Sequence, residues 1–285
     1  MALNTSADPM ISADWLSRRL QDGDLAVLDG SWFMPGSDRD ARAEFARGHI
    51  PGAVFFDIDA VSDQTSNLPH MLPSPSEFAA SARRLGVGAD DTLIVYDSQG
   101  LFSAPRVWWT FRAMGHAKVF VLDGGLPAWI AGGYPLETGW RTPTRAAFKA
   151  KTDPALVRDL KGVRSALASG DEQLLDARPA ARFAGAAPEP RPGLRGGHMP
   201  GALNAPFTEV VTHDGRLASA EVLRAAFHRA GLDLERPIVA TCGSGISAAV
   251  LALALARLGR DDVAVYDGSW AEWGGRDDTP VVTGR

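Results

Sequence analysis

The stretch Gly48-His-Ile-Pro-Gly-Ala53 returns later in the chain as Gly197-His-Met-Pro-Gly-Ala202, with a single change. In each half, a short apolar segment ending in aspartate precedes this motif. That aspartate lies 20 residues before His49 in the first half and 22 residues before His198 in the second. Repeated motifs at matched spacing are the signature of an internal repeat. The chain is therefore a tandem duplication.

The segments after each motif also correspond. The first half continues with the short apolar strand Leu93–Asp97 and the second with Ile238–Cys242, each followed by a helix-period segment, Arg106–Met114 and Ser247–Leu258. A second apolar strand and a turn containing tryptophan then follow in both halves. Short strands that alternate with helical patterns are typical of βαβ units. We predict an α/β fold with two tandem domains, each a parallel sheet flanked by helices.

The predicted domain limits follow from a change in composition. A polar segment with proline and glycine separates the two copies, which is typical of a domain linker. We place the first domain at residues 8–140, the linker at 141–155 and the second domain at 156–285.

Composition argues against several classes of protein. A net charge of −5 gives no reason to expect a nucleic-acid or membrane partner. One cysteine excludes an intramolecular disulfide, and the six histidines lack metal-ligand spacing, so we predict no metal and no cofactor. The start lacks a signal-peptide pattern, and the longest apolar run, Ala248–Ala256, is about half of a bilayer span. We expect a cytoplasmic protein.

The single cysteine opens the loop Cys242-Gly-Ser-Gly-Ile-Ser247, between a predicted strand and a predicted helix. Ligands bind at the carboxyl ends of strands in open α/β sheets. The glycines let several backbone N–H groups turn inward, and the helix dipole adds positive potential. Such a setting favours a reactive thiolate over an inert buried thiol, and it would also stabilise the anionic outer sulfur of a persulfide.

Two other interpretations of this loop are weaker. Gly243, Gly245 and Ala248 imitate a dinucleotide-binding fingerprint, with Asp267 at the end of the next strand. Only 18 residues follow Asp267, which is too few for the rest of a nucleotide-binding half. A cysteine phosphatase would need an arginine where Ala248 stands.

Taken together, these features resemble the tandem-domain rhodanese superfamily. The resemblance rests on the repeated Gly-His-x-Pro-Gly-Ala motif, the tryptophan turns and a cysteine in the second copy only, and it covers nearly the whole chain. The cysteine loop is similar to the Cys-Gly-Ser-Gly-Val-Thr loop of 3-mercaptopyruvate sulfurtransferases, with Ile246 and Ser247 as small departures. Thiosulfate sulfurtransferases carry Cys-Arg-Lys-Gly-Val-Thr, whose cations suit a dianionic donor.

The resemblance implies a set of binding residues. Arg182 and Arg191 match the arginines that bind the carboxylate and ketone of the donor, for which a guanidinium fork is well shaped. Gly243, Gly245, Ile246 and Ser247 form the rest of the expected binding loop. Arg106 either adds positive charge at a cleft between the domains or packs against the tryptophans that follow it.

The resemblance also implies a proton relay. Asp59, His70 and Ser244 match its members, although Asp63 is an alternative partner for His70. His49 and His198 occur in both copies, including the one without cysteine, so we assign them to the scaffold.

The implied reaction is sulfur transfer. Cys242 would take sulfur from 3-mercaptopyruvate as a persulfide, release pyruvate, and pass the sulfur to cyanide or to a thiol such as that of a thioredoxin-like protein. Asp97 stands in place of the cysteine in the first copy, which is predicted to be inactive. A thiosulfate sulfurtransferase and a non-catalytic sulfur-relay or partner-binding module are the alternatives.

Overall fold

The computed structural model describes residues 8–284, which form two compact units. The first unit contains residues 8–63, 73–153 and 213–217, and the second contains 64–72, 154–212 and 218–284. Residues 1–7, where a signal peptide was not expected, and residue 285, the end of the second predicted domain, lie outside the described residues.

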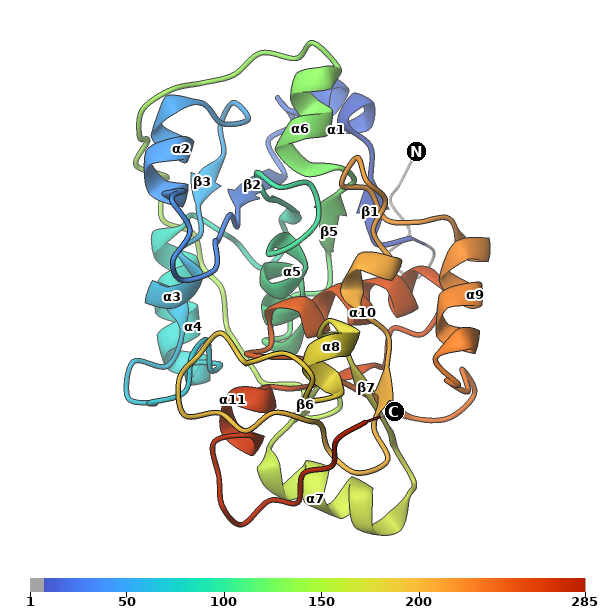
Figure 1. The fold of residues 1–285 in the computed structure, drawn as a ribbon. Coiled ribbons are helices and arrows are strands. Elements are labelled where there is room, and N and C mark those ends of the chain that lie inside the picture. Colours follow the sequence, from blue (N-terminus) through green and yellow to red (C-terminus); the bar gives the residue numbers. More distant parts are fainter. Residues whose placement is uncertain (1–7, 285) are drawn as a thin grey trace. The chain divides into compact units, whose positions relative to one another are not determined.

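The first unit is built on a five-stranded parallel sheet, coloured blue to green in Figure 1, with the strand order β1-β5-β4-β2-β3. Its strands are β1 (Met10–Ile11), β2 (Leu25–Asp29), β3 (Val54–Phe55), β4 (Thr92–Tyr96) and β5 (Val119–Leu122). Parallel strands need crossover connections, and the helices supply them. They are α1 (Ala13–Arg19), α2 (Ala41–Arg47), α3 (Ile58–Val61), α4 (Pro75–Arg84), α5 (Ala104–Ala113) and α6 (Gly125–Ala131).

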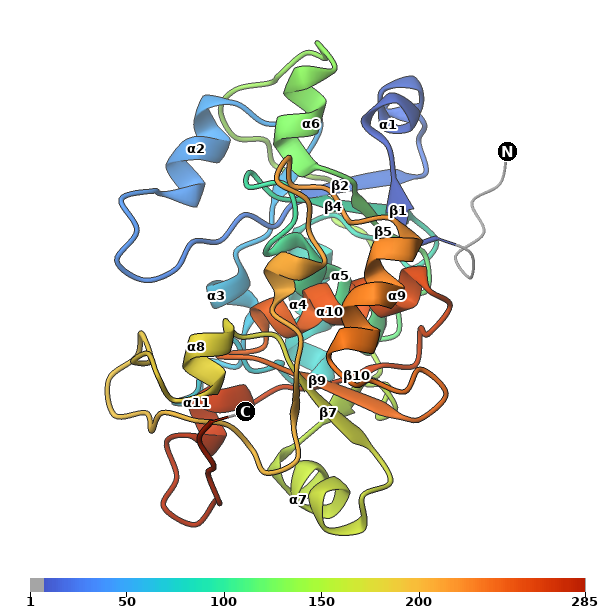
Figure 2. The same cartoon turned by 45° about the vertical axis from the view of Figure 1, so that its right-hand side comes forward.

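These helices cover both faces of the first sheet. Figure 2 shows α1 and α6 on one side and α4 and α5 on the other. A core on the first side joins Leu16 of α1, Phe45 of α2 and Trp129 of α6 to apolar side chains of the strands. Coverage of both faces explains why the central strand β4 is buried from Leu93 to Tyr96, as expected for a parallel sheet.

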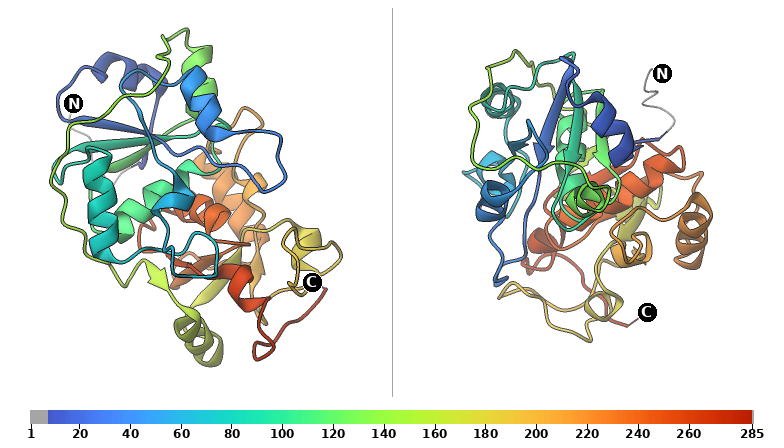
Figure 3. Two further views of the ribbon diagram at one scale, coloured as in Figure 1. Left: turned by 90° about the vertical axis from the view of Figure 1, so that its left-hand side faces the viewer. Right: turned by 90° about the horizontal axis from the view of Figure 1, so that it is seen from above.

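The second unit repeats this architecture with the strand order β6-β10-β9-β7-β8. Its strands are β6 (Val157–Arg158), β7 (Gln173–Asp176), β8 (Leu203–Asn204), β9 (Ile238–Thr241) and β10 (Ala264–Tyr266). Its helices are α7 (Leu160–Ser169), α8 (Ala180–Phe183), the 3₁₀ helix η1 (Phe207–Glu209), α9 (Ala220–Arg229), α10 (Ile246–Arg257) and α11 (Ser269–Trp273). Figure 3 shows its elements, yellow to red, from two further sides.

The sequence-based fold class is confirmed: both copies are parallel sheets flanked by helices. The helices predicted from the periodicity are present as α5 and α10, each beginning slightly earlier than predicted. The apolar run Ala248–Ala256 is the buried middle of α10, and apolar residues on all sides are typical of a core helix. None of the helices within residues 8–284 is long and apolar enough to cross a membrane.

Each unit includes a short segment from the other half of the chain. Residues 64–72, which precede α4, belong to the second unit, and residues 213–217, which precede α9, belong to the first. The two segments are equivalent, because both lead into a ten-residue helix capped by a serine, Ser74 or Ser219. These serines are 145 residues apart, as are Asp97 and Cys242.

The ends of the exchanged segments make matching hydrogen bonds. Leu72 N–H donates to Asp267 Oδ2 at 2.7 Å in the second unit, and Leu217 N–H donates to Asp123 Oδ1 at 2.9 Å in the first. The equivalent aspartates Asp123 and Asp267 therefore hold the exchanged segments.

Candidate functional site

Cys242 lies directly after β9, where the chain turns into α10. Its side chain is buried. Gly245 caps the helix with a left-handed backbone (φ 82°), a conformation that glycine adopts without strain. The helix therefore begins three residues after Cys242, and its positive N-terminal end lies close to the thiol in sequence and in space.

The first turn of α11 anchors the cysteine loop. Trp270 N–H donates to the carbonyl of Cys242 and Ala271 N–H to that of Gly243, both at 2.9 Å. Cys242 N–H donates to Ser269 Oγ at 3.4 Å. The tryptophan turn repeated in the sequence therefore supports the loop and holds Cys242 in a defined position.

His70 approaches this loop from the exchanged segment 64–72. Its Nδ1 lies 3.2 Å from the backbone carbonyl oxygen of Ser244, and both residues are buried. A carbonyl oxygen only accepts hydrogen bonds, so Nδ1 is the donor. Segment 64–72 is thus the part of the first half that reaches the cysteine loop within the second unit.

The other predicted relay residues belong to the first unit. Asp59 lies in α3 and accepts a hydrogen bond from Trp32 Nε1 at 3.0 Å. Asp63 ends the first segment of that unit. Arg106 is buried in α5, and its guanidinium lies 4.5 Å from the centre of the Trp109 ring. This stacking agrees with the packing role considered for Arg106.

Arg182 lies against the cysteine loop in the second unit. It belongs to α8, and a Cβ atom added to Gly243 would be 3.2 Å from Arg182 Nη2. Arg191 is half-buried in the loop that follows α8. Ile246 is buried and Ser247 is half-buried at the start of α10. The structure therefore gathers Cys242 and its loop, His70 and Arg182 within one unit.

Three residues that were not predicted from the sequence complete this arginine arrangement: Asp176, Arg178 and Glu189. Glu189, buried, accepts hydrogen bonds from both Arg182 and Arg178, and Arg178 also pairs with Asp176. Asp176 ends the apolar segment that precedes the second Gly-His-Met-Pro-Gly-Ala motif. No local pattern indicated that the three residues share a network.

The equivalent loop of the first copy holds a carboxylate where the second has a thiol. Asp97 Oδ2 accepts the backbone N–H groups of Phe102, Ser103 and Ala104 at 2.8–2.9 Å, and Oδ1 accepts that of Gln99 at 2.9 Å. These donors lie at the start of α5, the counterpart of α10. The inward N–H groups expected of such a loop are present here, and the protein's own anion occupies them.

The two scaffold histidines have matching surroundings. His49 Nδ1 lies 2.8 Å from the Phe45 carbonyl and its ring stacks on Phe45. His198 Nδ1 lies 2.8 Å from the Phe183 carbonyl and stacks on Phe183. Both are buried, which fits the structural role predicted for them.

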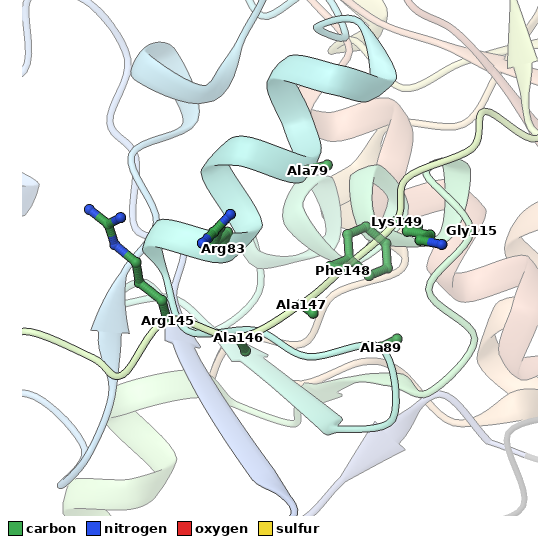
Figure 4. A pocket seen from close by; sticks show the side chains of 9 residues that line it. All are labelled: Ala79, Arg83, Ala89, Gly115, Arg145, Ala146, Ala147, Phe148 and Lys149. Atoms are coloured by element: carbon green, nitrogen blue, oxygen red, sulfur yellow. The ribbon is translucent and has the colours of Figure 1, made fainter.

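A separate cavity of about 760 Å³ lies within the first unit (Figure 4). Arg83, Arg145 and Lys149 line it, and the ring of Phe148 lies between Lys149 and the two arginines. None of the predicted site residues contributes to this cavity. Within residues 8–284, no three His, Cys, Asp or Glu side chains gather as metal ligands would.

Comparisons with known proteins agree with this architecture. The rhodanese-like domain model matches residues 12–132 and 159–276. The chain is 48% identical to the 3-mercaptopyruvate sulfurtransferase of Escherichia coli K12, over 95% of this chain and 96% of that protein. It is 42% identical to the mitochondrial thiosulfate/3-mercaptopyruvate sulfurtransferase 1 of Arabidopsis thaliana, over 97% of this chain and 79% of that protein.

Among solved structures, the crystal structure of the Escherichia coli 3-mercaptopyruvate sulfotransferase SseA aligns with a TM-score of 0.86 and 45% identity. The alignment covers 93% of this chain and 99% of that chain. A family model that matches both halves, and relatives of this identity over nearly the full length, establish the family. The chain belongs to the rhodanese family and contains two rhodanese-like domains.

Proposed function

We propose that the chain is a sulfurtransferase that moves sulfur from 3-mercaptopyruvate, through a persulfide on Cys242, to a thiol or cyanide. The observation that carries the proposal is the position of the chain's only cysteine. It is buried at the end of β9, in front of the N-terminus of α10, with the guanidinium of Arg182 against the next residue. This combination places positive potential beside the sulfur, where an anionic donor would bind.

In the proposed reaction, the Cys242 thiolate attacks the sulfur of 3-mercaptopyruvate while Arg182 and Arg191 bind its carboxylate and ketone. A sulfur–sulfur bond forms and the carbon–sulfur bond breaks. Pyruvate leaves as its enolate, which then takes up a proton. The acceptor next attacks the outer sulfur and regenerates the thiolate, which is covalent catalysis in two half-reactions.

His70 is proposed as the group that handles the proton. Its ring lies against the Ser244 carbonyl of the cysteine loop, and an imidazole can accept and return a proton near neutral pH. Asp59 is its proposed partner, with Asp63 as the alternative. Ser244, Gly243, Gly245, Ile246 and Ser247 are proposed to line the donor site. Arg106 is proposed either to add positive charge or to pack against the tryptophans that follow it, and its stacking on Trp109 supports the second role.

The first copy, proposed to span residues 8–140 before a linker at 141–155, is proposed to be inactive. A carboxylate cannot serve as the sulfur nucleophile, and the N–H groups around Asp97 already hold an anion. The acceptor is proposed to be a thioredoxin-like protein thiol or cyanide, and the compartment to be the cytoplasm. One Arabidopsis thaliana relative is mitochondrial by name, so fractionation of the native host would test the compartment.

The alternative donor is thiosulfate, because one relative carries both donors in its name. The loop argues against it, since Gly243 and Ser244 replace the cations that suit a dianion. The test compares pyruvate release from 3-mercaptopyruvate with thiocyanate formation from thiosulfate, with cyanide as acceptor in both. Preference for 3-mercaptopyruvate supports the proposal, and preference for thiosulfate replaces it. Turnover with neither, together with a persulfide on Cys242, favours the relay module.

A further inference from the structure

The carboxylate of Glu189 lies between two guanidinium groups next to the cysteine loop. Its Oε1 accepts a hydrogen bond from Arg178 Nη1 at 2.8 Å. Its Oε2 accepts from Arg182 Nε at 3.1 Å and from Arg182 Nη2. The Glu189 side chain is 1% exposed, so water does not screen these interactions. One buried acid therefore joins the arginine at the cysteine loop to a second arginine behind it.

Arg178 is held firmly on its other sides. Asp176 accepts from its Nε and Nη2, at distances down to 2.6 Å, and the carbonyl of Gly197 accepts from Nη2 at 2.9 Å. The guanidinium also lies 4.2 Å from the centre of the Trp270 ring. Burial alone would lower the pKa of Arg178, but the charges and hydrogen bonds of Asp176 and Glu189 raise it above its ordinary value. Arg178 is thus a charged hydrogen-bond donor, held in a fixed position, for the carboxylate of Glu189.

Glu189 in turn determines how Arg182 faces the loop. The carboxylate accepts hydrogen bonds from Nε and Nη2, and the guanidinium of Arg182 forms no other hydrogen bond within the described part of the chain. Glu189 thus occupies the edge of the guanidinium formed by Nε and Nη2, and the edge formed by Nη1 and the second hydrogen of Nη2 is the one left for a ligand, next to Gly243. The bidentate fork expected from the sequence can form at Arg182 only through this second edge.

The network is also balanced in charge. Asp176 and Glu189 carry two negative charges, and Arg178 and Arg182 carry two positive charges. The arginine at the cysteine loop consequently brings little net positive charge. A donor with one carboxylate needs one directed cation, whereas a dianion such as thiosulfate gains from excess positive charge.

We propose that Glu189 is a positioning residue that selects the sulfur donor: it holds Arg182 beside the Cys242 loop and cancels one positive charge there, so that a monoanionic donor is preferred to a dianion. This inference rests on the proposed sulfurtransferase function. Removal of the Glu189 charge, with its shape retained, adds one net positive charge. That charge acts twice as strongly on a dianion as on a monoanion.

The test compares Glu189→Gln and Glu189→Asp with the unchanged protein, using kcat/KM for 3-mercaptopyruvate and for thiosulfate. Glu189→Gln is expected to raise the thiosulfate-to-mercaptopyruvate ratio about tenfold, mainly through the two KM values. Glu189→Asp keeps the charge but shortens the reach, so both KM values should rise while the ratio stays within about twofold. An equal loss with both donors in Glu189→Gln would show a merely structural role and overturn the proposal.

A matched control is Glu172→Gln. Glu172 pairs with Arg158 in the same unit through two guanidinium nitrogens, as Glu189 does with Arg182, but the pair involves no residue of the cysteine loop. Loss of the Glu172 charge should leave the ratio of kcat/KM for thiosulfate to kcat/KM for 3-mercaptopyruvate unchanged. A tenfold shift in this control would mean that any lost carboxylate alters donor choice, which would also overturn the proposal.

Equilibrium binding separates this proposal from the proposed function. Calorimetry with pyruvate and with thiosulfate, on Cys242→Ser with and without Glu189→Gln, needs no turnover. If Glu189→Gln shifts the ratio of the two dissociation constants about tenfold in favour of thiosulfate, the role of Glu189 is supported. This holds even if the unchanged protein turns over neither donor, because that absence of turnover would overturn only the sulfurtransferase assignment. Turnover by the unchanged protein without a shift in binding would overturn only the role of Glu189.

Discussion

His70 and Gly215 occupy the same position of the two repeats, 145 residues apart, and both have a left-handed backbone, with φ of 62° and 75°. Glycine adopts this conformation without strain, whereas the same backbone conformation costs a residue with a side chain about 1–2 kcal/mol. His70, the strained residue, lies in segment 64–72, which reaches the cysteine loop. Gly215 lies in segment 213–217, which belongs to the unit without the cysteine. Strain at one copy only agrees with the role proposed for the His70 imidazole.

The first prediction concerns this strain. His70→Gly should be more stable than His70→Ala by about 1 kcal/mol, because glycine relieves the left-handed backbone. Both variants should lose most sulfur transfer from 3-mercaptopyruvate, since neither carries an imidazole. Urea unfolding and steady-state kinetics provide the two measurements. Equal activity of His70→Gly and the unchanged protein would remove His70 from the proposed mechanism.

The second prediction compares the two aspartates that hold the exchanged segments. Asp267→Ala and Asp123→Ala should each lower the free energy of unfolding by about 1–3 kcal/mol, because each leaves a backbone N–H of Leu72 or Leu217 without its acceptor. Only Asp267→Ala should reduce kcat/KM, by about tenfold, because it loosens the segment that carries His70. Equal kinetic effects would argue against a special role for segment 64–72.

The third prediction concerns the carboxylate in the first copy. Asp97→Asn should destabilise the fold by about 2 kcal/mol, because a neutral amide replaces an anion that accepts four backbone N–H groups. The kcat of the folded variant should remain within about twofold of the unchanged protein if this copy does no chemistry. Thermal unfolding and steady-state assays at a temperature well below the transition would check both statements.

The fourth prediction is a pH dependence of stability. Burial raises the pKa of Asp29 to about 6, hydrogen bonds from Ser31 partly oppose it, and the charge of Asp97 adds to it. The folded state thus binds a proton more tightly than the unfolded chain, so the contribution of Asp29 is greatest below pH 4 and is lost as the pH rises through about 6. Asp29→Asn cannot titrate and should gain up to about 3 kcal/mol relative to the unchanged protein between pH 4 and pH 7. A constant difference over this range would contradict the assignment.

The fifth prediction tests the contact between Gly243 and Arg182. Alanine at position 243 would place a Cβ 3.2 Å from Arg182 Nη2, so the guanidinium must move by a few tenths of an ångström. The KM for 3-mercaptopyruvate should rise about threefold with little change in kcat, because the donor is held less well before the reaction. Gly23→Ala is the control, since no atom lies within 4 Å of a Cβ added there.

Most of the fold could be predicted from local patterns. The repeated Gly-His-x-Pro-Gly-Ala motif, the apolar strands and the helical periods each lie within a few residues of one another, and together they indicated two parallel α/β copies. The cysteine loop was visible for the same reason, because its glycines and the start of the helix adjoin the cysteine in sequence. Arg182 was indicated only by family resemblance, since no local pattern connects it to position 243.

Long-range contacts decided the rest. His70 and Ser244 are 174 residues apart, and Leu72 and Asp267 are 195 residues apart. No local sequence pattern therefore indicates that segment 64–72 belongs to the second unit. The orientation of Arg182 also depends on a charge network assembled by α8 and the following loop. The sequence by itself determined the duplication, the sheet-and-helix order and the place of the cysteine, because periodicity and turn chemistry act locally. Only the tertiary structure decided which carboxylates and which exchanged segment surround each loop, because those contacts form once distant parts of the chain pack together.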